Sequence, residues 1–88
     1  MEYLVLKEIS LNPATATGRT RHYLGNNLLS VPAKLQIARY PEMGGFYLFY
    51  LDEHEKVMTD TFHDSIQSAL EQAKWEFNIS EADWQIVS

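Results

Sequence analysis

The densest run of apolar residues lies in the middle of the chain, at residues 46–51 (FYLFYL). Because side chains alternate between the two faces of a strand, this run makes both faces of one strand apolar. Such a strand is expected inside a sheet, with another layer, a loop or a partner covering each side. The polar residues 52–55 then reverse the chain. Residues 56–62 are predicted to return antiparallel, as the second strand of a hairpin.

An amphipathic helix is predicted to follow this hairpin. Its apolar stripe, at about 3.6 residues per turn, consists of Ile66, Ala69, Leu70, Ala73 and Phe77. Asp64 is predicted as the N-cap, with Gln67 three residues later as in a capping box. Asn78 is predicted to end the helix in a left-handed conformation. Residues 80–83 then suggest one further helical turn, and residues 84–87 a short closing strand.

Two more strands are predicted in the first half of the chain. In residues 2–10 the alternation places Tyr3, Val5 and Ile9 on one face and Leu4 and Leu6 on the other. Residues 33–40 alternate more cleanly, and the positions predicted to point inward are Ala33, Leu35 and Ile37. Residues 41–45 (PEMGG) are predicted to join this strand to residues 46–51 as a hairpin loop.

The segment from residue 11 to residue 32 has the weakest pattern. An unstructured loop of about 20 residues is unusual in a compact domain. We therefore expect a short strand near residues 19–24 and a segment laid over the core at residues 28–31. Because residues 46–51 are apolar on both faces, either this segment or another chain is expected to shield the second face of the sheet.

Together these elements predict an α+β fold in which an antiparallel sheet of four to five strands carries one main helix on one face. The length of 88 residues fits a single domain spanning residues 1–88. The predicted core consists of Leu35, Ile37, Leu48, Phe49, Ile66, Leu70, Ala73 and Phe77.

The composition narrows the classes of function. The chain has no cysteine, which excludes a disulfide framework, a thiolate nucleophile and a cysteine-based zinc site, and favours a reducing compartment. No apolar run approaches the roughly 20 residues of a membrane span. The first ten residues include acids and a lysine where a secretory signal has an uninterrupted apolar stretch. We therefore expect a cytoplasmic protein that does not bind membranes.

Charge is distributed unevenly along the chain. The formal net charge is −5, with five basic and three acidic residues in the first 44 positions and two basic and nine acidic residues in the last 44. An acidic domain repels the phosphate backbone, so we expect no nucleic-acid partner. The acidic second half instead favours a basic protein as partner.

Few residues are candidates for catalysis or metal binding. His63-Asp64 is a dipeptide of metal-dependent phosphohydrolases, but Asp64 as a helix cap explains it more simply. A second group, which could converge at the end of the hairpin and bind a divalent ion weakly, consists of Asp52, His54, Asp60 and His63. We interpret that group as a solvated turn. No catalytic constellation is found, so we expect no enzyme activity, no metal and no cofactor.

Two sets of surface residues are candidates for binding. Arg19 and Arg21, among hydroxyl-bearing neighbours, are a weak candidate for an anion site, although an ordinary exposed loop is the more economical interpretation. Trp75 is predicted 180° from the apolar stripe of the helix. It packs against Leu28-Leu29 or Ile79, lies flat on the helix surface, or anchors a protein interface. The hypothetical partner-binding residues are Trp75, Glu71, Gln72, Ser68, Glu53 and Glu55.

Two resemblances bear on function. Thr59-Asp60-Thr61, followed by a helix with Ser65-Ile66 and Ala69-Leu70, resembles in topology the domain of HicB-type antitoxins over residues 33–88. The chain departs from that family, since it lacks the Pro-Gly strand end and the appended DNA-binding segment. Residues 47–77, with YLDE, TDTFHDS and A-x-x-x-WEF, are similar to short bacterial proteins of unassigned function, some of them immunity-like.

These resemblances imply a small bacterial protein-binding domain without catalysis, of antitoxin or immunity type. The main alternative is a homo-oligomeric structural or regulatory protein, such as a homodimer that buries the second aromatic face against itself. A small metal-dependent enzyme using the histidine and aspartate group is the third hypothesis.

Overall fold

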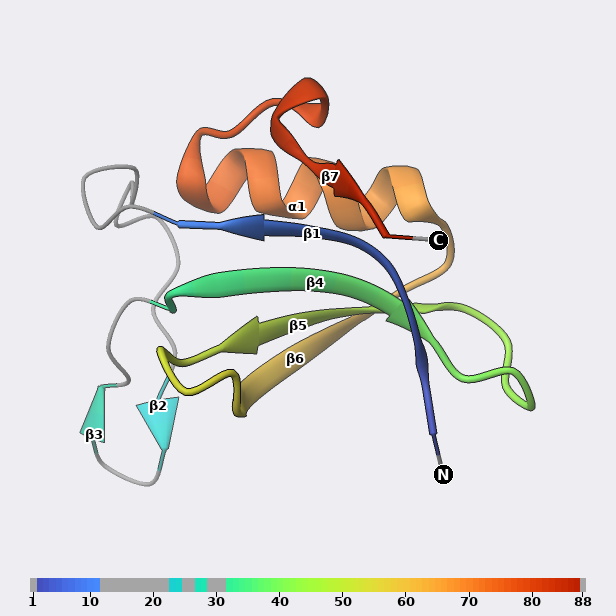
Figure 1. The fold of residues 1–88 in the computed structure, drawn as a ribbon, viewed down its shortest axis with the longest axis horizontal. Coiled ribbons are helices and arrows are strands. Elements are labelled where there is room, and N and C mark those ends of the chain that lie inside the picture. Colours follow the sequence, from blue (N-terminus) through green and yellow to red (C-terminus); the bar gives the residue numbers. More distant parts are fainter. Residues whose placement is uncertain (1, 12–22, 25–26, 29–31, 88) are drawn as a thin grey trace.

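The computed structural model describes residues 2–11, 23–24, 27–28 and 32–87. Its strands are β1 (Leu4–Ser10), β2 (Tyr23–Leu24), β3 (Asn27–Leu28), β4 (Lys34–Arg39), β5 (Phe46–Leu51), β6 (Val57–His63) and β7 (Gln85–Ile86). Its helices are α1 (Ile66–Phe77) and the short 3-10 turn η2 (Glu81–Asp83). Within the described residues, five strands form an antiparallel sheet in the order β6-β5-β4-β1-β7, and α1 lies along it (Figure 1). The predicted α+β class is confirmed.

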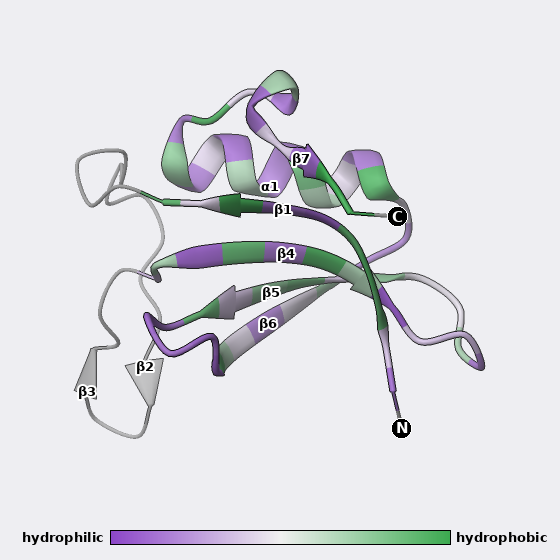
Figure 2. Cartoon of the chain, in the orientation of Figure 1, coloured by the Kyte–Doolittle hydropathy of each residue, from purple (hydrophilic) through white to green (hydrophobic). Residues whose placement is uncertain are grey.

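β5 lies between β4 and β6 and is buried on both faces. On the side of α1, Leu48 and Tyr50 are completely buried, and on the opposite side Phe49 and Leu51 are buried. Figure 2 shows the contrasting pattern of β4, in which hydrophobic and hydrophilic positions alternate. The prediction that the run of six apolar residues is an interior strand is therefore confirmed.

The main core lies between the sheet and α1. The sheet contributes Leu35, Ile37, Leu48 and Tyr50, and the helix contributes Ala69, Leu70, Ala73 and Phe77. Ile79 and Trp84, from the segment after α1, are buried in the same cluster, while Ile66 is only partly buried against it. The predicted core is thus largely confirmed, except that Phe49 belongs to a second cluster on the opposite face with Ala38 and Leu51.

The N-cap of α1 is Ser65, not Asp64 as the sequence pattern predicted. The Ser65 backbone is extended, with φ −147° and ψ 160°, and its side chain accepts a hydrogen bond from the Ser68 N–H at 3.1 Å. His63 is still paired with Phe46 in the sheet, so the chain turns into the helix one residue later than expected. At the other end, the predicted left-handed Asn78 is confirmed by its φ of 55°, and its N–H bonds the Lys74 carbonyl. The predicted further turn and closing strand correspond to η2 and β7.

The predicted faces of β1 are wrong, because this strand contains a bulge. Val5 pairs with Ala38 but Lys7 pairs with Ile37, so β1 has one extra residue at Leu6. One extra residue shifts every later side chain to the other face of the sheet. Ile9 therefore packs on the α1 side. On the opposite side, the Tyr3 ring lies 4.8 Å from the ring of Phe49 and 5.8 Å from that of Tyr40.

The face opposite α1 carries an aromatic cluster. Tyr47 lies at its centre, with ring centroids 5.4 Å from both Tyr40 and Phe62. The start of the chain curves across this end of the sheet (Figure 1), which brings in Tyr3. These rings cover part of the second face without a helix. Most of the segment that was predicted to shield it, at residues 12–22, 25–26 and 29–31, lies outside the described residues. The described part of that segment pairs as β2 and β3.

Gly45 allows Phe62 to pack across the start of β5, and its replacement by alanine is expected to destabilise the fold. Gly45 has a φ of +83°, and a Cβ there would clash with ring atoms of Phe62. The left-handed backbone alone costs an alanine about 1–2 kcal/mol. Chemical denaturation should therefore show a loss of at least about 1 kcal/mol. The matched control is Gly44→Ala, because a Cβ at Gly44 meets no atom within 4 Å. Equal stability of both variants would contradict this account of the turn.

Candidate functional site

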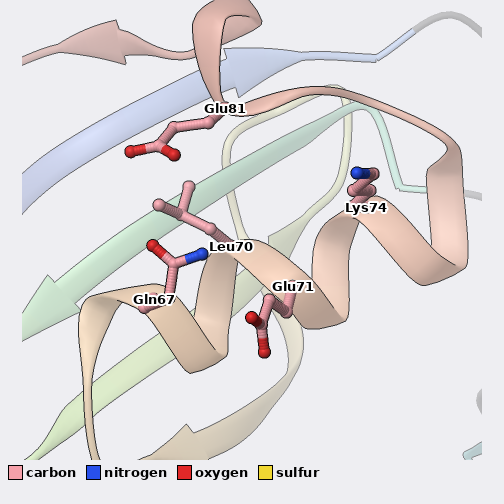
Figure 3. Close-up of a pocket in the computed structure, with 5 residues that line it drawn as sticks. All are labelled: Gln67, Leu70, Glu71, Lys74 and Glu81. Atoms are coloured by element: carbon pink, nitrogen blue, oxygen red, sulfur yellow. The ribbon is translucent and has the colours of Figure 1, made fainter.

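The outer surface of α1 has two adjoining shallow pockets. The first, of about 160 Å³, is lined by Gln67, Leu70, Glu71, Lys74 and Glu81. The second, of about 230 Å³, is lined by Glu71, Lys74, Trp75 and Asn78. Figure 3 shows the first, in which Glu81 from η2 lies across from the helical residues. Because Glu71 and Lys74 line both pockets, the pockets form one continuous strip. We call it the α1 surface, formed by Gln67, Glu71, Lys74, Trp75, Asn78 and Glu81.

The helical period explains this strip. Residues 67, 71, 74 and 78 follow one another at intervals of four, three and four, which keeps them on one side of a helix. Lys74 lies in the last turn, where a cation interacts favourably with the negative end of the helix dipole. Trp75 is 48% exposed beside these polar residues. A large, half-exposed aromatic ring with polar neighbours has the composition of an interface anchor.

Two residues that were predicted to share this surface point elsewhere. Ser68 is half-buried and its Oγ lies 2.9 Å from Nδ1 of His63. Gln72 is also half-buried and donates a hydrogen bond to the carboxyl of Glu76. Both side chains therefore belong to the boundary between α1 and the sheet. Of the four helical candidates, Glu71 and Trp75 remain on the exposed surface.

The other two predicted partner-binding acids lie in the turn between β5 and β6. Glu55 accepts a hydrogen bond from Nζ of Lys34 at 2.6 Å, and that contact lowers its pKa. The Oε1 atom of Glu53 lies 3.6 Å from Nε2 of the neighbouring His54. Asp52 closes the turn by accepting the N–H groups of Lys56 and His54, which lowers the pKa of its carboxyl. Asp52 and Glu55 therefore stabilise the turn, whereas Glu53 is an exposed residue of it. The anion candidates Arg19 and Arg21 lie outside the described residues.

The histidines and aspartates of the hairpin do not converge at its end. His54 and Asp52 lie in the turn before β6, whereas His63 closes its far end. Seven strand residues separate these ends by about 20 Å. Asp60 lies on the face opposite His63, because side chains alternate along the strand. Among the described residues, no group of three or more histidines, aspartates or glutamates is placed to hold a metal ion.

A buried polar network instead connects α1 to β5 and β6. The Tyr50 hydroxyl donates to Glu76 at 2.6 Å, and Glu76 is only 3% exposed. His63 is also buried. Its Nε2 is hydrogen-bonded to the Thr61 hydroxyl at 2.7 Å, and its Nδ1 is hydrogen-bonded to the Ser68 hydroxyl at 2.9 Å. Burial, together with the Glu76 carboxyl, raises the pKa of Tyr50, so this hydroxyl keeps its proton and acts as a donor. The network satisfies its own polar groups and orients the helix on the sheet.

This network corrects two sequence-based interpretations. His63 was assigned to a group interpreted as a solvated turn, and Glu76 belongs to the acidic second half that was expected to favour a basic partner. A signal for Glu76 was present, because with Ala69 and Ala73 it follows the helical period of the buried stripe. Likewise, the regular spacing of Gln67, Lys74 and Asn78 with Glu71 would have indicated the α1 surface. The position of Glu81 depends on how η2 folds back and has no such local signal.

Stability is expected to fall in mild acid because of His63. Burial lowers the pKa of this imidazole, while Glu76 and Asp64 oppose the shift. Below the unfolded value of about 6.5, the unfolded chain binds a proton that the folded chain resists, so the stability present above about pH 6.5 is lost as pH falls. The pKa values of Asp52 and Glu55 are also lowered, but these two groups change the stability of the fold only below about pH 4.5. Thermal melts from about pH 7.5 to 5.5 should show a smaller decrease for His63→Gln than for the wild type. Identical pH profiles would contradict the assignment.

Comparison of the chain with protein-family models, with curated proteins and with solved structures gives no match. The resemblance to HicB-type antitoxins and immunity-like proteins stays a prediction from the residues. In the part of the chain that the structure describes, no helix has the length and apolar character needed to cross a membrane.

Proposed function

We propose that this chain is a small bacterial protein-binding domain without catalytic activity, of antitoxin or immunity type, and that its α1 surface binds a basic protein. The observation that carries the proposal is the exposure of Trp75, at 48%, beside the pockets formed with Glu71 and Lys74. Tryptophan is enriched among the residues that dominate binding energy, especially where polar neighbours form a rim. We place the protein in the cytoplasm, because a chain without cysteine suits a reducing compartment.

The charge supports a basic partner. The chain has a net charge of −5, and two acids, Glu71 and Glu81, line the first pocket with the single base Lys74. An acidic protein attracts a basic one over distance, which accelerates association and suppresses binding of acidic competitors. Affinity for such a partner should decrease as salt increases, because surface charges are screened beyond about 8–10 Å at physiological ionic strength.

The test compares wild type with Trp75→Ala. The variant is expected to weaken partner binding by about 2 kcal/mol, or about 30-fold in Kd, because it removes the aromatic anchor. Its unfolding free energy should change far less than on truncation of a core residue, because about half of the Trp75 side chain is already exposed. The partner is captured from host lysate, identified by mass spectrometry, purified, and titrated calorimetrically with both proteins.

Ile86→Ala is the matched control, because Ile86 is an apolar residue of β7 that is 78% exposed and lies outside the α1 surface. This control should bind the partner like the wild type. Equal affinity of wild type and Trp75→Ala, or an acidic partner, would refute the proposal.

The exposed aromatic residues opposite α1 favour one alternative, a homo-oligomeric structural or regulatory protein. Phe62 is 54% exposed and Tyr3 is 37% exposed at the border of the aromatic cluster. A second copy on this face would bury both rings. Light scattering after size exclusion decides between the two functions: a dimer that Phe62→Ser converts to a monomer supports the alternative, and a monomeric wild type excludes it.

A further inference from the structure

The two edges of the sheet differ in length. β7 forms one edge with two residues, whereas β6 forms the other with seven, from Val57 to His63. Figure 1 shows β6 at the border of the sheet, and in the described part of the chain no strand pairs with its outer side. A long edge strand presents backbone N–H and C=O groups that another extended chain can use. The β6 edge is therefore the larger template for strand addition.

The side chains of β6 define what such a strand must carry. On the face opposite α1, the edge presents Asp60 between Val57 and Phe62. Asp60 is exposed, Val57 is 43% exposed and Phe62 is 54% exposed. Phe62 is held in place by its ring contact with Tyr47 at 5.4 Å. The edge thus offers one negative charge flanked by apolar groups.

A second copy of this chain is a poor match for this edge. Asp60 is the midpoint of β6, so antiparallel pairing of two copies over the full strand places Asp60 directly opposite its counterpart. Like charges in directly opposed positions destabilise a sheet. β6 also has an extra residue at Met58, where its register with β5 shifts. Two paired copies would have to accommodate this bulge twice, whereas an added strand of another protein meets it once. A strand with a cation at its centre meets none of the charge repulsion.

We propose that the β6 edge takes an extended segment of a basic protein as an added strand. In it, a lysine or arginine lies opposite Asp60 and apolar residues lie next to Val57 and Phe62. Main-chain hydrogen bonds supply the affinity and the charge pair supplies the selectivity, as in other cases of strand addition. This inference rests on the proposed function for the basic nature of the partner, but it uses a surface separate from that of Trp75.

The test uses synthetic peptides and the full ¹⁵N-labelled chain. The probe is an acetylated, amidated heptapeptide, Thr-Val-Thr-Lys-Thr-Val-Thr, and its counterpart has glutamate in place of lysine. The lysine peptide is expected to shift amide resonances of residues 57–63 and to bind about three- to tenfold more tightly than the glutamate peptide. Asp60→Lys should reverse this preference. The control Asp64→Lys, an exposed acid beyond the strand, should preserve it.

Backbone contacts are tested separately. A lysine peptide N-methylated at alternate residues, which lacks the donors facing β6, should lose binding. Resonance changes on α1 instead of β6, no binding up to about 5 mM peptide, or an unchanged preference in Asp60→Lys would overturn the proposal.

Failure of this inference is distinguishable from failure of the proposed function. If the lysine peptide does not bind but Trp75→Ala weakens the natural partner, the β6 proposal fails and the proposed function stands. If the peptide binds with reversible charge preference while Trp75→Ala binds the natural partner normally, the α1 surface is refuted and the β6 edge is supported.

Discussion

Replacing Leu70 by alanine is expected to lower the free energy of unfolding by about 2–5 kcal/mol. Leu70 is 5% exposed and packs in the main cluster with Leu35 and Leu48. The truncation removes buried apolar area and leaves a cavity that the surrounding strands cannot fully close. The loss is a large share of the roughly 5–15 kcal/mol that stabilises a typical domain. Urea denaturation followed by circular dichroism measures it.

The control for Leu70 is Gln67→Ala, which lies three residues earlier in α1 and is exposed. It should change stability by no more than about 0.5 kcal/mol. A loss below about 1 kcal/mol for Leu70→Ala would mean that the buried face of α1 is assigned wrongly.

Glu76→Ala is expected to cost about 2–3 kcal/mol of unfolding free energy. The Tyr50 hydroxyl, in a residue that is completely buried, loses its carboxyl acceptor at 2.6 Å, and Gln72 loses the same acceptor. Removing one partner of a buried hydrogen bond costs about 1–3 kcal/mol, and each buried methylene that is lost adds about 0.8 kcal/mol. Denaturation with urea again provides the measurement.

A double variant separates hydrogen bonding from packing in this network. Replacing both partners of a buried bond by apolar groups of similar shape is far less costly than removing one. Tyr50→Phe combined with Glu76→Leu should therefore be more stable than Glu76→Ala. Glu71→Ala, an exposed glutamate of the same helix, is the control and should have little effect. If Glu76→Ala is as mild as this control, Glu76 has no structural role at the helix–sheet boundary.

Local patterns predicted what depends on local periodicity. The six apolar residues from Phe46 require a strand with two covered faces, and the structure places that strand between β4 and β6. The stripe through Leu70 and Phe77 determined which side of α1 is buried. Asn78 ended the helix as predicted, because few residue types adopt a left-handed backbone easily. In each case the residues within one or two turns contain the necessary information.

Local patterns failed where a single residue of register decides the outcome. The bulge at Leu6 reversed the expected side of Ile9, and alternation alone does not reveal where an extra residue is inserted. The N-cap of α1 is Ser65 instead of Asp64, because His63 is still held in the sheet by pairing with Phe46. Both neighbouring residues are good caps, so propensity did not distinguish them.

For the candidate sites too, some features follow from the sequence and others follow only from the tertiary structure. The helical period by itself placed Trp75 and Glu71 on the outside of α1, and composition by itself determined the acidic charge of the chain. Only the tertiary structure turned Ser68 and Gln72 toward the sheet and supplied Tyr50 as the partner of the Glu76 carboxyl. Only the sheet order made β6 a long edge with Asp60 at its centre. The physical reason is that periodicity assigns a side chain to a face of its own element, whereas its neighbours on that face come from residues distant in sequence.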